Sequence, residues 1–175
     1  TIVAYPAGKG KRYIIPDGIT KIGTHSFFAC YPITYIHIPN SVKTIELFAF
    51  ASCTDLDTII LGNSVDSIEV AAFRINDRLK TIYSMNPIPP AAHTGAFDSF
   101  NSFFIQCTLH VPVGSLQAYK NAEVWKNFKN IVENDFTGIE RPSPNKAKIF
   151  GNKNSIAFRN IEPDTDISIY DTTGK

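Results

Sequence analysis

A unit of 23 residues occurs three times without a gap, at residues 13–35, 36–58 and 59–81. When the three copies are aligned, several columns are apolar in every copy. These columns are Ile15/Ile38/Leu61, Ile19/Val42/Val65, Ile22/Ile45/Ile68, Phe27/Phe50/Phe73 and Ile33/Leu56/Leu79. A fixed period in the twenties is typical of a solenoid, because each short unit buries its apolar side only by stacking on its neighbours. The repeat therefore predicts a ladder of rungs with the three phenylalanines in a row.

Each copy predicts two short extended segments joined by a turn. In the middle copy the first segment ends at a proline, and its residues alternate along the chain. Alternation places Ile36 and Ile38 inward and Tyr35 and His37 outward. The Asn-Ser pair that follows predicts a turn, and residues 42–45 predict the second extended segment. Units this short have no room for a full helix, so the array should be rich in strand and turn.

The three cysteines leave two interpretations open. Cys30 and Cys53 share one repeat position, where the third copy has Asn76. One rung apart means about 5 Å if the rungs stack as strands do, so a disulfide is geometrically possible. The alternative, which we favour, is a buried column of free thiols that pack as small apolar groups. A zinc site is not expected, because no C-x-x-C pair and no matched histidine spacing occur.

Length and charge exclude several classes of protein. A chain of 175 residues allows one domain, or one domain with a small appendage. Lys plus Arg number 17 and Asp plus Glu 16, so the net charge is +1. This balance argues against a nucleic-acid partner, which favours a clustered basic face. No apolar run approaches the roughly 18 residues that a membrane-spanning helix needs.

The period breaks in residues 82–133. A proline-rich stretch follows Tyr83, residues 95–97 (Gly-Ala-Phe) look like a displaced copy of the phenylalanine position, and residues 108–112 predict a strand. Ser115 is placed to cap a helix that runs to about Phe128. The end of a solenoid exposes apolar surface, so we expect residues 107–133 to close it and Trp125 to be a structural anchor rather than a ligand-stacking residue.

The two ends of the chain differ from the array. Residues 1–5 predict a strand that is broken by Pro6, Gly8 and Gly10. At the other end, residues 134–144 read as a linker, and residues 145–175 as a partial β module. Its expected strands are 147–150, 155–158 and 167–170, followed by a turn at 171–174. Three strands with open edges would be marginal alone. The predicted domain organisation is thus a capped solenoid at 1–133, a linker and a small β tail.

The middle repeat also carries a family resemblance. It matches the pattern I-P-x-S-V-x-x-I-x-x-x-A-F-x-x-C-x-x-L at Ile38, Pro39, Ser41, Val42, Ile45, Ala49, Phe50, Cys53 and Leu56. This pattern resembles the leucine-rich repeats of BspA-like bacterial surface proteins, from which Ser26, Gly62 and Asn76 depart. The run from Thr108 to Glu133 resembles the motif that closes such arrays. The resemblance implies a right-handed leucine-rich-repeat superhelix, adhesion, and an extracellular or cell-surface location.

The tail carries a second resemblance. The sequence I-S-I-Y-D-T-T-G-K at residues 167–175 resembles the start of the C-terminal sorting module of secreted Bacteroidetes proteins, which implies association with the outer membrane. The match covers only the first part of that module. Further strands of the module would be expected to follow.

Two outward columns on the first extended segments are the candidate binding surface. One column holds Arg12, and the other begins at Ile14. The residues that we expect to contact a ligand are Tyr35, Thr58 and Thr81 in the first column and His37, Ile60, Tyr83 and His110 in the second. An exposed strip of aromatic and aliphatic groups suits contact with a protein or a glycan. The alternative is an ordinary surface of good strand-forming residues, and the sequence does not decide between the two.

No motif dictates a reaction. The chain lacks G-x-S-x-G, H-E-x-x-H, phosphate-loop and dinucleotide-binding patterns, and the GKGK at residues 8–11 has the wrong spacing. Cys30 near His25 suggests a thiol nucleophile, but its column is expected to be buried and inert. We therefore predict a protein that is not an enzyme and has no cofactor and no metal.

Two functions remain in view. The first is a recognition module that binds an extracellular protein or glycan. The second is a structural spacer and cap of a longer surface protein, with a tail for export or anchoring.

Overall fold

The computed structural model describes residues 1, 10–97, 101–136, 148–152 and 155–159. The chain forms two compact units, Thr1–Ile139 and Glu140–Lys175, and each is considered by itself. The first unit contains the repeats. Residues outside the described part include all but the first residue of the strand predicted at 1–5, most of the predicted linker, the predicted strand at 167–170 and the turn at 171–174.

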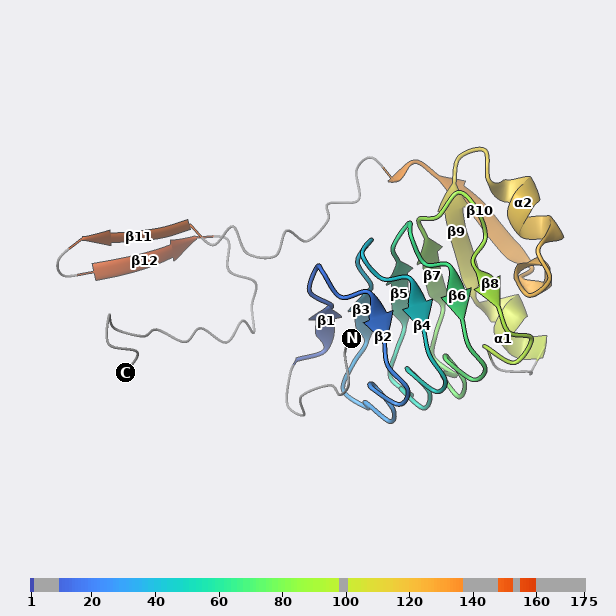
Figure 1. The fold of residues 1–175 in the computed structure, drawn as a ribbon, viewed down its shortest axis with the longest axis horizontal. Helices are drawn as coiled ribbons and strands as arrows, with labels where there is room; N and C mark the ends of the chain where they lie inside the picture. The colour runs from blue at the N-terminus through green and yellow to red at the C-terminus, as the bar shows by residue number, and fades with distance from the viewer. Residues whose placement is uncertain (2–9, 98–100, 137–147, 153–154, 160–175) are drawn as a thin grey trace. The chain divides into compact units, whose positions relative to one another are not determined.

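The first unit is built on a parallel sheet of six strands. In spatial order they are β1 (Arg12–Ile14), β3 (Tyr35–His37), β5 (Thr58–Leu61), β7 (Thr81–Ser84), β9 (Thr108–Pro112) and β10 (Asn130–Asn134). The order follows the sequence, so each strand is one rung of a ladder (Figure 1). Paired residues in the first four strands are 23 apart, as Tyr35 with Thr58 and Thr58 with Thr81 show. The predicted repeat solenoid is confirmed.

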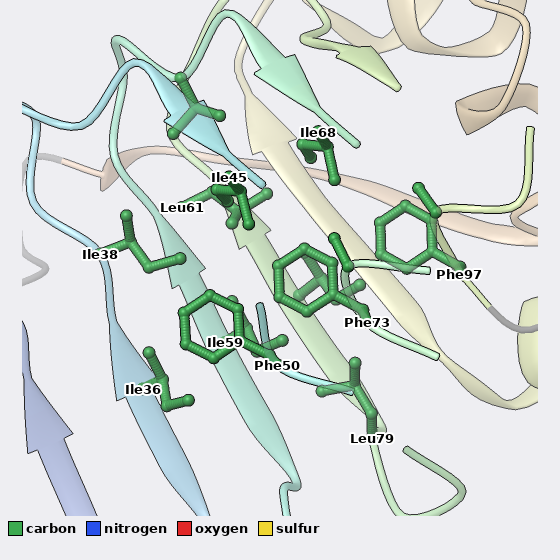
Figure 2. Packing of buried hydrophobic residues seen from close by; sticks show 14 of the residues in the cluster. Ile36, Ile38, Ile45, Phe50, Ile59, Leu61, Ile68, Phe73, Leu79 and Phe97 are labelled. Carbon is green, nitrogen blue, oxygen red and sulfur yellow. The ribbon is translucent and has the colours of Figure 1, made fainter. Parts of the chain in front are cut away.

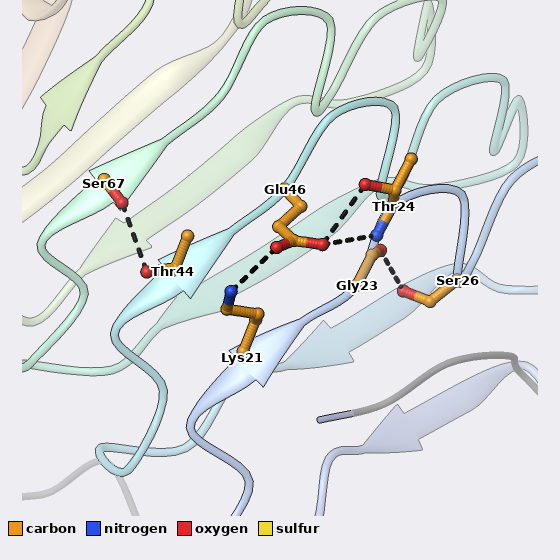
Figure 3. Close-up of polar contacts among 7 residues, drawn as sticks. All are labelled: Lys21, Gly23, Thr24, Ser26, Thr44, Glu46 and Ser67. Carbon is orange, nitrogen blue, oxygen red and sulfur yellow. Dashed lines mark hydrogen bonds and ion pairs between the residues drawn. The ribbon is translucent and has the colours of Figure 1, made fainter.

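A second parallel sheet has four shorter strands, β2 (Lys21–Ile22), β4 (Thr44–Ile45), β6 (Ser67–Ile68) and β8 (Ala91–Ala92). Ile22, Ile45 and Ile68 are buried on its inward side, and its outward side carries Lys21, Thr44 and Ser67, followed by the exposed Ala91. On the outward side the Glu46 carboxylate lies 3.0 Å from the Lys21 ammonium and accepts the Thr24 N–H at 3.0 Å (Figure 3). Ion pairs as exposed as this one contribute little to stability, so the sheet is held mainly by its buried side.

The turns form a third hydrogen-bonded side of the ladder. Phe27, Phe50 and Phe73 each donate their N–H to a carbonyl of the next rung at 2.8 Å. Two positions per repeat reach this geometry with left-handed backbone although neither is glycine. They are His25/Phe48/Ala71 and Ala29/Ser52/Ile75, with φ between 53° and 60°. Such backbone costs about 1 kcal/mol or more per residue, so the stacked rungs must hold it in place.

The aligned phenylalanines form one continuous stack in the core. Ring centroids are 4.8 Å apart between Phe27 and Phe50, 5.3 Å between Phe50 and Phe73, and 5.4 Å between Phe73 and Phe97. Figure 2 shows the rings of Phe50, Phe73 and Phe97 beside the isoleucines and leucines of the other columns, which are buried. The predicted row is confirmed, and residues 95–97 do supply its fourth member.

The 23-residue period breaks after residue 81, as the sequence predicted, but residues 82–97 and 101–134 continue the ladder. Strands β7, β9 and β10 stay parallel and in register, and β9 has the predicted bounds of 108–112. The irregularity lies in the lengths of the connections, because Thr81 pairs with Thr108 and Thr108 with Asn130.

Gly62 departs from the repeat pattern for a steric reason, because a Cβ at this position would lie 2.5 Å from the Pro39 carbonyl oxygen.

The predicted helix from Ser115 to about Phe128 is wrong in its extent. Within residues 101–136 the structure has three short helical segments, α1 (Asn101–Gln106), α2 (Leu116–Asn121) and a 3-10 turn at Trp125–Asn127. Helix α2 ends because Ala122 is extended, with φ −77° and ψ 138°. Ser115 makes no side-chain capping hydrogen bond. The Glu133 carboxylate accepts the Leu116 N–H at 3.0 Å in its place.

Aromatic side chains fill the core beside these helical segments. Trp125 is buried, and its indole Nε1–H donates to the Pro90 carbonyl at 2.7 Å. The Tyr119 hydroxyl donates to the Asn86 carbonyl at 2.8 Å and lies 2.6 Å from the Ser84 hydroxyl. These contacts make Trp125 a structural residue, as expected from the sequence.

The second unit contains a two-stranded antiparallel hairpin in its described part. Strand β11 (Lys148–Asn152) pairs with β12 (Ser155–Arg159), close to the predicted ranges of 147–150 and 155–158. A hairpin of two strands is marginal in water without further contacts.

Candidate recognition surface

The register of the six-stranded sheet brings the predicted ligand-contacting residues into two adjacent rows, which we call the strand face. Arg12, Tyr35, Thr58 and Thr81 pair in succession in the first row. Ile14, His37, Ile60, Tyr83 and His110 pair in succession in the second. Adjacent parallel strands are about 4.8 Å apart, so the rows are continuous along the ladder. Register alone therefore gathers all seven predicted residues.

The exposure of the second row differs from the prediction at two residues. His37 is 8% and Ile60 5% exposed, so both are buried although they were expected to face solvent. In the same row Ile14, which lies on the edge strand of the described sheet, is 36% exposed. The part of the strand face open to a ligand is therefore smaller than predicted. It consists of the half-buried Tyr35, Thr58, Thr81, Tyr83 and His110.

Tyr83 and His110 form a stacked pair on neighbouring rungs, with ring centroids 4.6 Å apart and planes 19° apart. The Nδ1 atom of His110 is hydrogen-bonded to the Asn134 amide oxygen. Because that oxygen only accepts, the Nδ1 proton is donated to it, and Nε2 of a neutral ring is left as an acceptor. Phe136 lies edge-on to Tyr83 at 6.4 Å. Sequence reasoning missed Asn134 and Phe136, because the 23-residue period gives no sign of a sixth strand.

The first row carries one fixed charge at its end. The Arg12 guanidinium carbon lies 4.1 Å from the centre of the Tyr35 ring, a cation–π contact. Burial raises the pKa of the Tyr35 hydroxyl, and the positive charge of Arg12 acts against that rise. Further along the row the side chains are uncharged, and the Thr58 hydroxyl donates to Asp57 at 2.8 Å. Within the described residues of both rows, Arg12 is the one fixed charge.

A second exposed aromatic group, on the turn side, was not predicted from the sequence. The His25 ring stacks on Phe48 at 5.1 Å and meets Phe28 edge-on at 5.4 Å. Phe28 is 49% exposed. Because His25 and Phe48 share a repeat position and Phe28 lies three residues after His25, a search for aromatic residues in the turn columns would have found the group.

The cysteine column has a structural role. Cys30, Cys53 and Cys107 are free thiols, which favours the column of free thiols over a disulfide, but Cys30 is half-buried and not buried as expected. The Cys53 thiol donates to the Phe27 carbonyl at 3.0 Å, and one rung on Asn76 donates to the Phe50 and Phe73 carbonyls at 3.0 Å each. Burial raises the pKa of Cys53 to about 12 and also raises that of Cys30. Raised values disfavour the thiolate that nucleophilic chemistry requires.

A family model for the BspA-type leucine-rich-repeat region matches residues 7–110 with six copies. The match covers more than half of the chain and extends beyond the three ungapped repeats on both sides. The chain belongs to the BspA-type leucine-rich-repeat family.

Several solved structures are similar to this BspA-type chain. The pneumococcal vaccine antigen PcpA is 14% identical over 76% of this chain and 44% of its own, with a TM-score of 0.44. A leucine-rich cell surface protein from Faecalibacterium prausnitzii is 17% identical over 76% and 35%, with a TM-score of 0.38. The T. pallidum leucine-rich-repeat protein is 17% identical over 71% and 70%, with a TM-score of 0.41. The chain thus spans less than half of the first two proteins.

None of the curated proteins compared with this BspA-type chain matches it. Among its described residues, no three His, Cys, Asp or Glu side chains are grouped so that they could hold a metal ion. In the same residues there is no helix with the length and apolar character needed to cross a bilayer.

Proposed function

We propose that this chain is a non-enzymatic recognition module at the cell surface or outside the cell, which binds an extracellular protein or glycan through the strand face. The observation that carries the proposal is the register of the sheet, which sets half-buried aromatic and hydroxyl side chains in two continuous rows. Membership of the BspA-type family and the resemblance of the repeats to bacterial surface proteins support it. The resemblance of the tail to a sorting module supports association with the outer membrane.

The burial of His37 and Ile60 sharpens which residues would contact a partner. Tyr35, Thr58, Thr81, Tyr83 and His110 are the proposed contact residues, and His37 and Ile60 would support them from within the sheet. The near absence of charge from these rows favours a partner surface that is also largely uncharged, since an unpaired charge loses its hydration on contact.

The test is a pair of matched double variants. The first is Thr58→Glu with Thr81→Glu, on adjacent rungs of the strand face. The control is Thr44→Glu with Ser67→Glu, which are half-buried and on adjacent rungs of the four-stranded sheet. Both variants place two carboxylates side by side, so their costs in stability should be similar.

Binding of the full chain to panels of extracellular-matrix proteins and glycans would be measured by surface plasmon resonance. We expect the wild type and the control to bind a common partner and the strand-face variant to lose at least tenfold in affinity. Equal binding by all three chains, or loss in the control alone, would contradict the proposal.

A second function is favoured by the closed aromatic end of the ladder. Trp125, Tyr119 and Phe128 are buried there, which suits the terminal cap of a longer array, with the tail serving export or anchoring. In that case charge on the strand face would leave cell attachment unchanged, and removal of residues 140–175 would abolish surface display.

A further inference from the structure

His110 on β9 presents an unprotonated ring nitrogen on the strand face. Its Nδ1 atom is hydrogen-bonded to the Asn134 amide oxygen, and this bond fixes the ring proton on Nδ1. Within the described residues the Nε2 atom makes no hydrogen bond, and it is not buried. In the neutral ring Nε2 is therefore a hydrogen-bond acceptor that a ligand can reach.

The groups around this nitrogen are rings, methyl groups and hydroxyls. On the neighbouring strands His110 pairs with Tyr83 and Val132, and the Tyr83 ring stacks on it at 4.6 Å. Two residues earlier on β7 and β9 are Thr81 and Thr108, which lie on the same side of the sheet. Among the described residues neither threonine hydroxyl has a hydrogen-bond partner. The site thus offers one acceptor and two hydroxyls beside apolar surface.

Within the described residues the one fixed charge of the two rows is distant from this site. Arg12 lies on β1, four rungs from β9, which is about 19 Å at the spacing of parallel strands. Surface charges are screened over about 8 Å at physiological salt. The Glu133 carboxylate on β10 accepts the Gly114 and Leu116 N–H groups, and Asp135 is exposed beyond the end of that strand. The rows thus favour a ligand whose donor is uncharged.

We infer that the strand face takes a neutral glycan, one hydroxyl of which donates to Nε2 of His110, and that Asn134 is the positioning residue that keeps this nitrogen free of a proton. The inference rests on the proposed function and narrows its partner to a glycan. A sugar ring combines uncharged hydroxyl donors with an apolar C–H face. A protein offers fewer such donors, because most of its backbone N–H groups are already paired and its lysine and arginine donors are charged.

The acceptor depends on the protonation state of His110. In the protonated ring both nitrogens donate, so glycan binding should weaken as the pH falls. The groups that face the ring are Tyr83 on β7 and Val132 and Asn134 on β10, and none of them gains a proton in acid. Asn134→Asp would still hold the proton on Nδ1, but its carboxylate favours the charged ring, so binding should be lost at a higher pH than in the wild type. Asn134→Leu would leave either nitrogen able to hold the proton.

The test screens the full chain against neutral glucans, mannans and chitin oligosaccharides and titrates the best binder by calorimetry from about pH 8 to about pH 5. His110→Phe keeps a ring beside Tyr83 and removes the acceptor, and we expect it to lose about tenfold in affinity at the higher pH. Asn134→Leu should also bind more weakly, whereas Asn134→Asp should bind as the wild type at the higher pH. The control is His93→Phe, which lies outside the six-stranded sheet and should not change binding.

Two kinds of outcome would overturn the inference and leave the proposed function standing. One is a wild type that binds no neutral glycan but binds an extracellular-matrix protein and loses it in Thr58→Glu with Thr81→Glu. The other is wild-type affinity in His110→Phe, or a wild-type pH profile in Asn134→Asp, which decides the matter if His110→Phe does not fold. A wild type that binds neither a glycan nor a protein would overturn the proposed function as well.

Discussion

The four regular rungs, β1, β3, β5 and β7, and the terminal rungs belong to the same sheet but differ in the connections between their strands. From β1 to β7 every paired residue is 23 positions from its partner. The next pairs are Thr81 with Thr108 and Thr108 with Asn130, so one connection is longer and the last is shorter. The strands nevertheless stay parallel and in register. This difference shows that a rung is defined by its hydrogen-bonded strand and the inward side chains of that strand. The length of the connection between two strands can vary without disturbing their pairing.

The aromatic cores of the two regions also differ, because the regular rungs repeat one ring arrangement and the terminal region does not. The regular rungs stack identical rings nearly parallel, with planes 22° apart for Phe27–Phe50 and 2° apart for Phe50–Phe73. In the terminal region Trp125 meets Phe97 at 68° and Tyr119 at 78°. The repeated rings all lie nearly parallel, whereas the terminal rings mix edge-to-face contacts with stacked ones such as Trp125 on Phe128 at 20°, and aromatic pairs favour both arrangements.

The largest expected effect is on the terminal region. Trp125→Ala removes a buried ring and its hydrogen bond to Pro90, so we expect a loss of about 3–5 kcal/mol in the free energy of unfolding. Chemical denaturation monitored by far-UV circular dichroism would measure it. Trp125→Phe keeps an aromatic ring and should lose less. A loss below about 1 kcal/mol in Trp125→Ala would mean that the aromatic cluster does not hold the terminal rungs.

A smaller effect is expected inside the regular rungs. Asn76→Ala leaves the Phe50 and Phe73 carbonyls without their donor, which should cost about 1–3 kcal/mol. Asn76→Cys restores the residue of the aligned column, whose thiol donates to one carbonyl in the preceding rung, and should cost less. If the cysteine variant is the less stable of the two on thermal melting, the column does not act through its donors.

Alkaline pH should weaken the terminal region through Tyr119. Burial raises the pKa of Tyr119 from 10.0 to about 12, so the folded chain holds its proton where the unfolded chain loses it. The stability that this group contributes is present below pH 10 and falls as pH rises toward 12, by about 1 kcal/mol at pH 11. Stability measured from pH 9 to 11 should fall less steeply in Tyr119→Phe. Equal slopes would show that Tyr119 ionises as readily in the folded chain.

The smallest expected effect is a gain in stability. Ser52 has φ 60°, a backbone region that glycine adopts without strain, so Ser52→Gly should stabilise the regular rungs by about 0.5–1 kcal/mol. Thr54→Gly in the same turn is the control, because Thr54 is not among the residues with positive φ and should only lose stability. A lower melting temperature for Ser52→Gly than for the wild type would show that the turn is not strained at this residue.

The spacing of apolar residues was enough to predict the ladder. A period of 23 fixes which side chains lie above one another, and the stack of Phe27, Phe50 and Phe73 follows directly. Alternation likewise placed Ile36 and Ile38 in the core. These features depend on the packing of each repeat against a similar repeat. The sequence of one repeat is therefore enough to predict its contacts with the next.

Other features depended on contacts between residues that no period relates. The sixth strand, the division of the expected helix at Ala122 and the capping of Leu116 by Glu133 all arise where the chain packs against unlike segments. The burial of His37 and Ile60 also depends on such contacts. Alternation predicts on which side of a strand a residue lies, but it does not predict which neighbouring groups cover that residue. The repeat therefore predicts which side chains stack on equivalent side chains of the next rung. The exposure of each residue and the packing at the end of the ladder depend instead on tertiary contacts with segments outside the repeat.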